Sequence, residues 1–300
     1  MIGALISVRG QALILASVVV LIGAILGSTF FRASTTDYSR TPVLFVHGHG
    51  LTSADWNPLL HKLKRSGYPS TYLSAIDIRP SRMANVEAAE YFVAPGVEEL
   101  LSRANATAKL AGLEIVHERV DIVAHSMGAV SSRWYVAKIA PQRVRTWISV
   151  AGANHGTNAL CEHIDEGAME MCPAFARSRD DSEIQIDLNG NIAELQDESP
   201  YGLGIDPDGA PSISPDPLRH ILYLTVRIDP DEWIIPAESA VLAGAGGVLL
   251  NLPLKLSIEE TSPGNFLLQQ HTDHMGMLKD KNFLQLMEFL LLARDSYVSD

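Results

Sequence analysis

Ser126 lies where a buried strand pattern gives way to a helical one, a position from which a serine can attack a carbonyl group. Residues Val120–Ala124 are apolar except for one aspartate, and helix-forming residues begin at Met127. A serine on a sharp turn between a strand and a helix projects its hydroxyl above the sheet, and the turn needs small residues two positions before and after it. Ala124 and Gly128 occupy those positions. The pattern predicts a nucleophile at Ser126, although small residues around a serine also occur in ordinary turns.

Two backbone amides are candidates for stabilising a negatively charged oxygen beside Ser126. One belongs to Met127, and the other to His49 in the His-Gly-His-Gly loop that follows the apolar run Val43–Val46. An oxyanion hole for acyl transfer takes one donor from the residue after the nucleophile and one from a loop after an earlier strand. We therefore predict His49 and Met127 as the oxyanion donors, while the loop's glycines would also suit a plain turn.

Five histidines follow Ser126 and could serve as its general base: His155, His163, His220, His271 and His274. In a fold that carries its serine on such a turn, the chain order is serine, acid, then histidine. His274 lies in a polar loop directly before the last amphipathic helical pattern, where the histidine of such a fold belongs. We predict His274 as the base, with His271 of the same loop as the alternative.

The acid that orients this histidine is expected after a strand that follows the serine. The apolar run Leu222–Ile228 leads directly into Asp229-Pro230-Asp231. A carboxylate there would accept the imidazole N–H and stabilise the imidazolium. Asp231 is the predicted acid and Asp229 the alternative, and the remaining aspartate serves the turn around Pro230.

The elements that must position these residues alternate between short β-branched runs and longer helical patterns from about residue 40 onward. This alternation predicts an α/β fold with a mostly parallel sheet and helices on both faces. Strands are expected at Val43–Val46, Val120–Val123, Val144–Val150 and Ile221–Ile228, and helices at Trp56–Ser66, Glu87–Gly112, Met127–Ile139 and Lys281–Arg294. The stretch Asn158–Pro217 breaks the alternation and is predicted to be an insertion over one end of the sheet, a candidate lid.

The amino-acid composition excludes several classes of protein. The 300 residues are 47% hydrophobic and 19% charged, which excludes a disordered chain, and two cysteines are too few for a disulfide scaffold. The net charge is −12 at pH 7. This sign repels phosphate backbones, so we expect no nucleic-acid partner.

An uncharged apolar run near the N-terminus predicts export. Ala12–Gly27 is apolar or small except for one serine, and it lies between Arg9 and Arg32. With its flanks the run approaches the roughly 20 residues that cross a bilayer, and it lacks the small-residue pair of a cleavage site. Residues 1–33 are therefore predicted to be a membrane anchor, with a cleaved signal peptide as the alternative, and residues 34–300 a catalytic domain.

Cys161 and Cys172 lie close together in the predicted insertion. A close pair behind an export-type segment predicts one disulfide that closes a loop, and two unpaired cysteines are the alternative. The disulfide would place the catalytic domain outside the cytoplasm, either membrane-anchored or secreted.

Five segments together resemble the α/β-hydrolase lipases, and more narrowly small bacterial lipases with an A-H-S-M-G box. They are Phe45-Val46-His47-Gly48-His49-Gly50, Ala124-His125-Ser126-Met127-Gly128, Asn154-His155-Gly156-Thr157, Asp231-Glu232-Trp233-Ile234-Ile235-Pro236 and His274-Met275-Gly276-Met277-Leu278. The resemblance implies the α/β-hydrolase fold and ranks Asp231 above Asp229, because Asp231 matches the acid of the family's D-E-I-V-x-P loop. It also implies rim and structural roles for residues 154–157 and the cysteine pair. The stretches Asn158–Pro217 and Gly244–Asn265 depart from the family's pattern.

These observations predict a serine carboxylic-ester hydrolase, a lipase or esterase that acts on an apolar ester or lipid through Ser126, Asp231, His274 and an acyl-enzyme. No metal or organic cofactor enters this scheme. An extracellular polyester such as a polyhydroxyalkanoate is the alternative substrate, since depolymerases with the same box belong to the family. A rival from another class is a membrane-tethered binding protein on an inactive hydrolase scaffold. The membrane would be a partner only through an uncleaved leader.

Overall fold

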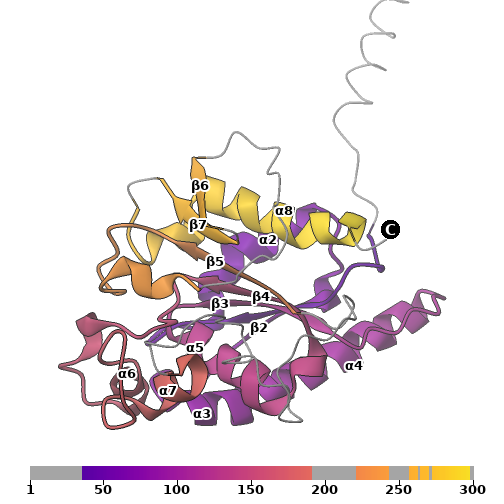
Figure 1. Cartoon of the computed structure of the whole chain (residues 1–300). Helices are drawn as coiled ribbons and strands as arrows, with labels where there is room; N and C mark the ends of the chain where they lie inside the picture. Colours follow the sequence, from indigo (N-terminus) through magenta and orange to yellow (C-terminus); the bar gives the residue numbers. More distant parts are fainter. Residues whose placement is uncertain (1–35, 191–220, 243–256, 263, 270–271, 298–300) are drawn as a thin grey trace, which may run out of the picture. The chain divides into compact units, whose positions relative to one another are not determined.

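The computed structural model describes residues 36–190, 221–242, 257–262, 264–269 and 272–297 (Figure 1). The chain divides into two compact units, Met1–Thr36 and Asp37–Asp300. The predicted leader, residues 1–33, lies outside the described residues, and so do residues 191–217 of the predicted insertion. Among the helices that the structure does describe, none combines the length and the apolarity needed to span a bilayer.

The second unit is built on a seven-stranded sheet with the strand order β2-β1-β3-β4-β5-β7-β6. All neighbouring strands are parallel except β6 and β7, which pair antiparallel. The strands are β1 (Val43–Val46), β2 (Leu73–Ile76), β3 (Val120–His125), β4 (Val144–Val150), β5 (Leu222–Arg227), β6 (Ile258–Ser262) and β7 (Asn265–Leu268). The predicted mostly parallel sheet is confirmed, and β2, β6 and β7 are additions that the apolar runs did not reveal.

Helices cover both faces of the sheet, as predicted (Figure 1). On one face α2 (Asn57–Arg65) packs with α8 (Lys281–Tyr297), and on the other lie α3 (Asn85–Ala88), α4 (Ala94–Leu110) and α5 (Met127–Trp134). A π-helical turn, Ala89–Val93, joins α3 to α4, whose second residue is Pro95. Proline supplies no N–H, so a local change in the helical hydrogen-bond pattern before it is expected.

Successive side chains of the central strands point to opposite faces of the sheet and pack into two separate apolar cores. In β1 the side chains of Val43 and Phe45 belong to the core under α2 and α8, while Leu44 and Val46 belong to the core under α4. Both sides are fully buried because a parallel sheet carries helices on each face. This burial explains why the strand is a continuous apolar run in the sequence.

The described part of the predicted insertion, Asn158–Gly190, is here named the wall segment. It contains α6 (Glu166–Glu170) and α7 (Glu183–Asn189), and the predicted disulfide between Cys161 and Cys172 is confirmed. Its apolar side chains form a third core with residues of α5: Leu160, Ala168, Met171, Ile184 and Leu188 pack with Met127 and Val130. The wall segment is thus part of the packed domain.

Candidate active site

Ser126 occupies the turn between β3 and α5 with φ 55° and ψ −125°. This left-handed backbone is unfavourable for a residue with a Cβ atom and is the kind of strain that functional sites retain. A Cβ added at Gly48 would lie 2.7 Å from the Cβ of Ser126, and one added at Gly128 would lie 2.4 Å from the carbonyl oxygen of His47. Both glycines are therefore required for the close approach of the β1 loop to the serine turn.

The structure brings His274 and Asp231 together, although 43 positions separate them in the sequence. The Nδ1 atom of His274 lies 3.0 Å from Oδ1 and 2.9 Å from Oδ2 of Asp231. Backbone N–H groups of Trp233 and Ile234 also donate to Oδ1, at 2.8 and 2.9 Å. Asp231 and His274 are both buried. Their mutual hydrogen bonds fix the imidazole with its N–H on Nδ1, so Nε2 is its basic nitrogen.

The alternative residues lie elsewhere. Asp229 contacts Arg227 at 3.4 Å, and its side chain is 45% exposed. His271, the alternative base, lies outside the described residues.

A pocket of about 150 Å³ lies between Ser126 and His274, the predicted nucleophile and base. Ser126, His274 and His49 line it, together with apolar side chains from the wall segment and the loops after β1, β5 and β7. These apolar residues are Leu51, Leu160, Met171, Trp233, Ile234 and Met275. A reacting group in this pocket would meet one serine, two imidazoles and an otherwise apolar lining.

The loop after β1 is held from two sides. His47 is buried, accepts the N–H of Ile78 at Nε2 (2.9 Å) and donates from Nδ1 to the Gly48 carbonyl (2.9 Å). Burial lowers the pKa of His47, against the opposing effects of the Gly48 carbonyl, Asp77 and Asp55. A histidine that accepts a backbone N–H is neutral, so this contact requires the uncharged ring.

His49, whose amide is a predicted oxyanion donor, carries its side chain toward the wall segment. Its Nε2 lies 2.8 Å from Oδ1 of Asp165, the residue that caps α6. Burial raises the pKa of Asp165, but hydrogen bonds from His49 and the Ala168 N–H, and the charges of His49 and Arg82, outweigh it and lower that pKa. Met127, the other predicted donor, is the first residue of α5, and the first N–H groups of a helix have no intrahelical acceptor.

His125 is a site residue that the sequence analysis did not assign. Its ring is fully buried and lies with its centroid 4.5 Å from that of His274, the two ring planes inclined by 46°. Its Nε2 donates to the His274 carbonyl at 3.1 Å. Burial, and then the neighbouring His274, lower its pKa well below the usual range. A histidine at the end of a buried strand, directly before the serine, was the available signal.

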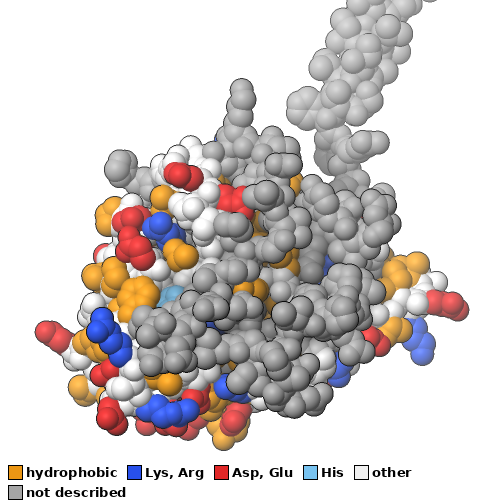
Figure 2. Space-filling model, viewed as in Figure 1, with side chains coloured by type: hydrophobic (Ala, Val, Ile, Leu, Met, Phe, Trp, Pro, Cys, Tyr) orange, Lys and Arg blue, Asp and Glu red, His pale blue; other side chains and the backbone are white. Residues whose placement is uncertain are grey.

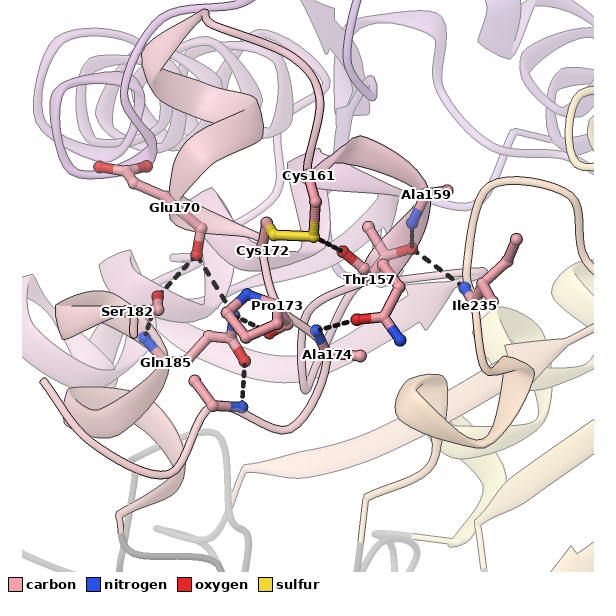
Figure 3. Close-up of a disulfide and its surroundings, with 12 residues drawn as sticks. Thr157, Ala159, Cys161, Glu170, Cys172, Pro173, Ala174, Ser182, Gln185 and Ile235 are labelled. Carbon is pink, nitrogen blue, oxygen red and sulfur yellow. Dashed lines mark hydrogen bonds between the residues drawn. A yellow bond between two sulfur atoms is a disulfide. The ribbon is translucent and has the colours of Figure 1, made fainter. Parts of the chain in front are cut away.

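Thr157 connects the loop of the acid to the wall segment (Figure 3). Its hydroxyl donates to the Trp233 carbonyl at 2.6 Å and accepts the N–H groups of Ile235 (3.0 Å) and Ala159 (3.2 Å). Gly156 has φ +78°, and a Cβ there would lie 2.5 Å from the Met171 carbonyl oxygen. The Asn-His-Gly-Thr turn is therefore a junction between the acid loop and the disulfide region.

The loop that follows Asp231 exposes two apolar side chains, of which Trp233 lines the pocket. Trp233 is 42% and Ile235 43% exposed, and both follow Asp231 directly in the acid loop. Figure 2 shows hydrophobic side chains gathered beside a histidine on the left of the molecule, with charged side chains around them. Within the described residues no cluster of three or more His, Cys, Asp and Glu side chains has an arrangement suited to a metal ion.

Comparisons with known proteins agree on the type of fold. The family model described as Lipase (class 2) matches residues 40–192, more than half of the chain. Among solved structures, Aspergillus fumigatus lipase B is similar with a TM-score of 0.53 and 14% identity, over 86% of this chain and 54% of that one. The mature form of the Bacillus licheniformis lipase BlEst2 has a TM-score of 0.47 and 14% identity, over 87% of this chain and 96% of that one.

The present chain thus spans about half the length of lipase B. A search among curated proteins finds no match. At 14% identity a structural likeness shows the fold alone, and that fold is the predicted α/β-hydrolase fold.

Proposed function

Because the chain belongs to the class 2 lipase family and is thus a carboxylic-ester hydrolase, we propose that it cleaves esters through a covalent acyl-enzyme on Ser126. The observation that carries this proposal is the paired hydrogen bond between His274 and Asp231 in the pocket that Ser126 lines. A serine, an imidazole and a buried carboxylate that accepts from Nδ1 of this imidazole are the three groups that serine hydrolysis requires.

In the proposed reaction, Oγ of Ser126 attacks the ester carbonyl while Nε2 of His274 accepts the hydroxyl proton. The carbonyl oxygen becomes an oxyanion, and the N–H groups of His49 and Met127 donate to it. When the C–O bond to the alcohol breaks, His274 returns the proton to the leaving oxygen. Water then attacks the acyl-enzyme by the same route and releases the acid. Asp231 stays ionised and stabilises the imidazolium in both steps.

The substrate and the location follow from the pocket and the disulfide. An apolar lining favours esters with an apolar acyl group over charged ones. The disulfide indicates an oxidising, extracytoplasmic location. We propose that the N-terminal residues 1–33 bring the enzyme there, either as an anchor or as a signal that is removed.

The decisive experiment measures ester turnover by the full-length chain and its Ser126→Ala variant. Loss of the nucleophile in a serine hydrolase lowers turnover by about 10⁶. Ser102→Ala, at an exposed position of α4, is the matched control and should retain wild-type turnover. A Ser126→Ala variant with wild-type turnover, or a folded wild-type chain without any esterase activity, contradicts the proposal.

A further inference from the structure

Each cysteine of the disulfide directly follows a residue of the catalytic pocket. Leu160 precedes Cys161 and Met171 precedes Cys172, and both side chains line the pocket with Ser126 and His274. Both are nearly inaccessible, at 4% and 1% exposure. The Cα atoms of the two cysteines are 5.1 Å apart, so the covalent bond fixes the separation of the chain segments that carry these two walls.

The backbone around the disulfide is fixed by further contacts, of which Figure 3 shows several. The Thr157 N–H donates to the Met171 carbonyl at 2.6 Å. Gln185 donates to the Pro173 carbonyl at 2.8 Å, and Ser182 donates to that of Glu170 at 2.8 Å. The wall behind the pocket is therefore rigid at the residues that determine how much room an acyl group has.

Glu170 also attaches α6 to α3. Its carboxylate accepts the N–H and the amide group of Asn85 at 2.5 and 2.7 Å. The Gly167 N–H donates to the Arg82 carbonyl at 3.2 Å, and a Cβ at Gly167 would lie 2.7 Å from Sδ of Met127. With α6 seated this closely, room for a longer acyl chain cannot arise from a small shift of the helix.

We propose that the Cys161–Cys172 disulfide determines acyl-chain selectivity, because it fixes Leu160 and Met171 as walls that limit the acyl group to about six carbon atoms. The inference rests on the proposed ester hydrolysis at Ser126. The size limit refers to the part of the acyl chain that the pocket covers, because the pocket is open to solvent on one side and further carbon atoms would lie in water. The pocket volume of about 150 Å³ is that of a cavity that accommodates a group of about the size of benzene.

The first test follows kcat/KM of the full-length chain over a series of p-nitrophenyl esters from acetate to decanoate. Each methylene that enters the pocket should raise kcat/KM by about fourfold, up to about hexanoate, beyond which the gain should stop. Met171→Ala removes Cγ, Sδ and Cε from the wall. The rise should then continue for about two further carbon atoms.

Met169→Ala is the matched control, because Met169 lies two residues before Met171, in α6, and is 51% exposed. It should leave the chain-length dependence unchanged. A wild type whose kcat/KM rises steadily to decanoate, or a Met171→Ala variant that loses activity by the same factor on every ester, overturns the selectivity proposal. Both outcomes leave hydrolysis at Ser126 intact, whereas a wild type inactive on all esters contradicts the proposed function itself.

The second test removes the covalent bond, by reduction of the wild type and by the double substitution Cys161→Ser and Cys172→Ser. Acetate turnover should stay within about threefold of the oxidised enzyme, while the preference for hexanoate over acetate should fall about tenfold or more. Thermal unfolding establishes whether each sample is folded. If the double variant does not fold, the hexanoate preference of the reduced wild type provides the test. An unchanged hexanoate preference in a folded protein without the disulfide overturns the proposal.

Discussion

His274 is held at three of its polar groups, which leaves Nε2 as the nitrogen available to Ser126. Asp231 accepts from Nδ1, the Glu232 carboxylate accepts the backbone N–H at 3.0 Å, and His125 donates to the carbonyl. The neighbouring His125 ring cannot replace His274 as a base, because burial lowers its pKa and its own N–H donates to the His274 carbonyl. The imidazole of His125 thus helps to hold His274 in position.

The choice between the two aspartates gives a prediction at this scale. Asp231→Asn should lower kcat by about 10⁴, because an amide in place of the carboxylate favours the wrong tautomer of His274 and cannot stabilise the imidazolium. Asp229→Asn should change kcat by less than about threefold, since Asp229 is 45% exposed and its side chain contacts Arg227, not the imidazole of His274. Ester turnover of the two variants tests this assignment. A larger loss of kcat in Asp229→Asn than in Asp231→Asn would identify Asp229 as the acid.

At the scale of elements, continuous apolar runs predicted the strands that are buried on both faces. The two strands at the edges of the sheet were not predicted, because their side chains are less buried and their sequences are not continuous apolar runs. The edge strand β2, with the sequence Leu-Ser-Ala-Ile, has only one fully buried residue, and β6 at the other edge has none among Ile258–Ser262. Such strands are specified by pairing with a neighbour in the sheet, which leaves little trace in local hydropathy.

The loop after β1 contacts α5 so closely at Gly128 that we expect a single added methyl group to lower both stability and activity. Gly128→Ala should place a Cβ against the carbonyl oxygens of His47 and Val46, for which the distances would be 2.4 and 2.8 Å. We expect a loss of about 1–3 kcal/mol in the free energy of unfolding. We also expect kcat/KM to fall more than about tenfold, because the displaced loop carries the His49 amide.

Gly96→Ala is the control for this effect. Its Cβ would lie 2.9 Å from the Ile76 side chain, on the helix side of the sheet. It should cost stability by the same overpacking mechanism and leave kcat/KM near the wild-type value. Equal losses of activity in the two variants would show that Gly128 acts through stability alone.

At the scale of the whole molecule, the topology explains why the reactive residues could be chosen from the sequence. Strands β3, β4 and β5 are parallel neighbours, so their carboxyl ends meet at one edge, where Ser126 and Asp231 follow β3 and β5. Ligands of open α/β sheets bind at this edge. The contacts of His125 with His274 and of Glu170 with Asn85 depend on loop conformations that no local pattern specifies.

Because burial keeps His47 and His125 neutral, we expect the free energy of unfolding of the whole domain to decrease in mild acid. Burial lowers the pKa of His47 and, more strongly, of His125 below the usual value of 6.5. Below that value the unfolded chain takes up protons that the folded chain does not, so the free energy of unfolding decreases as the pH falls. Each histidine can contribute a slope of up to about 1.4 kcal/mol per pH unit until the pH reaches its folded-state pKa.

His47→Gln isolates one of these contributions. The glutamine carbonyl can accept the Ile78 N–H that His47 accepts now, but it does not titrate. Urea unfolding between about pH 5 and 7 should show a slope for the variant that is shallower by up to about 1.4 kcal/mol per pH unit. Groups such as Glu170, whose pKa burial raises, titrate in both proteins and cancel in the difference. Parallel stability curves would mean that His47 titrates in the folded protein as it does in the unfolded chain, against its burial and its contact with Ile78.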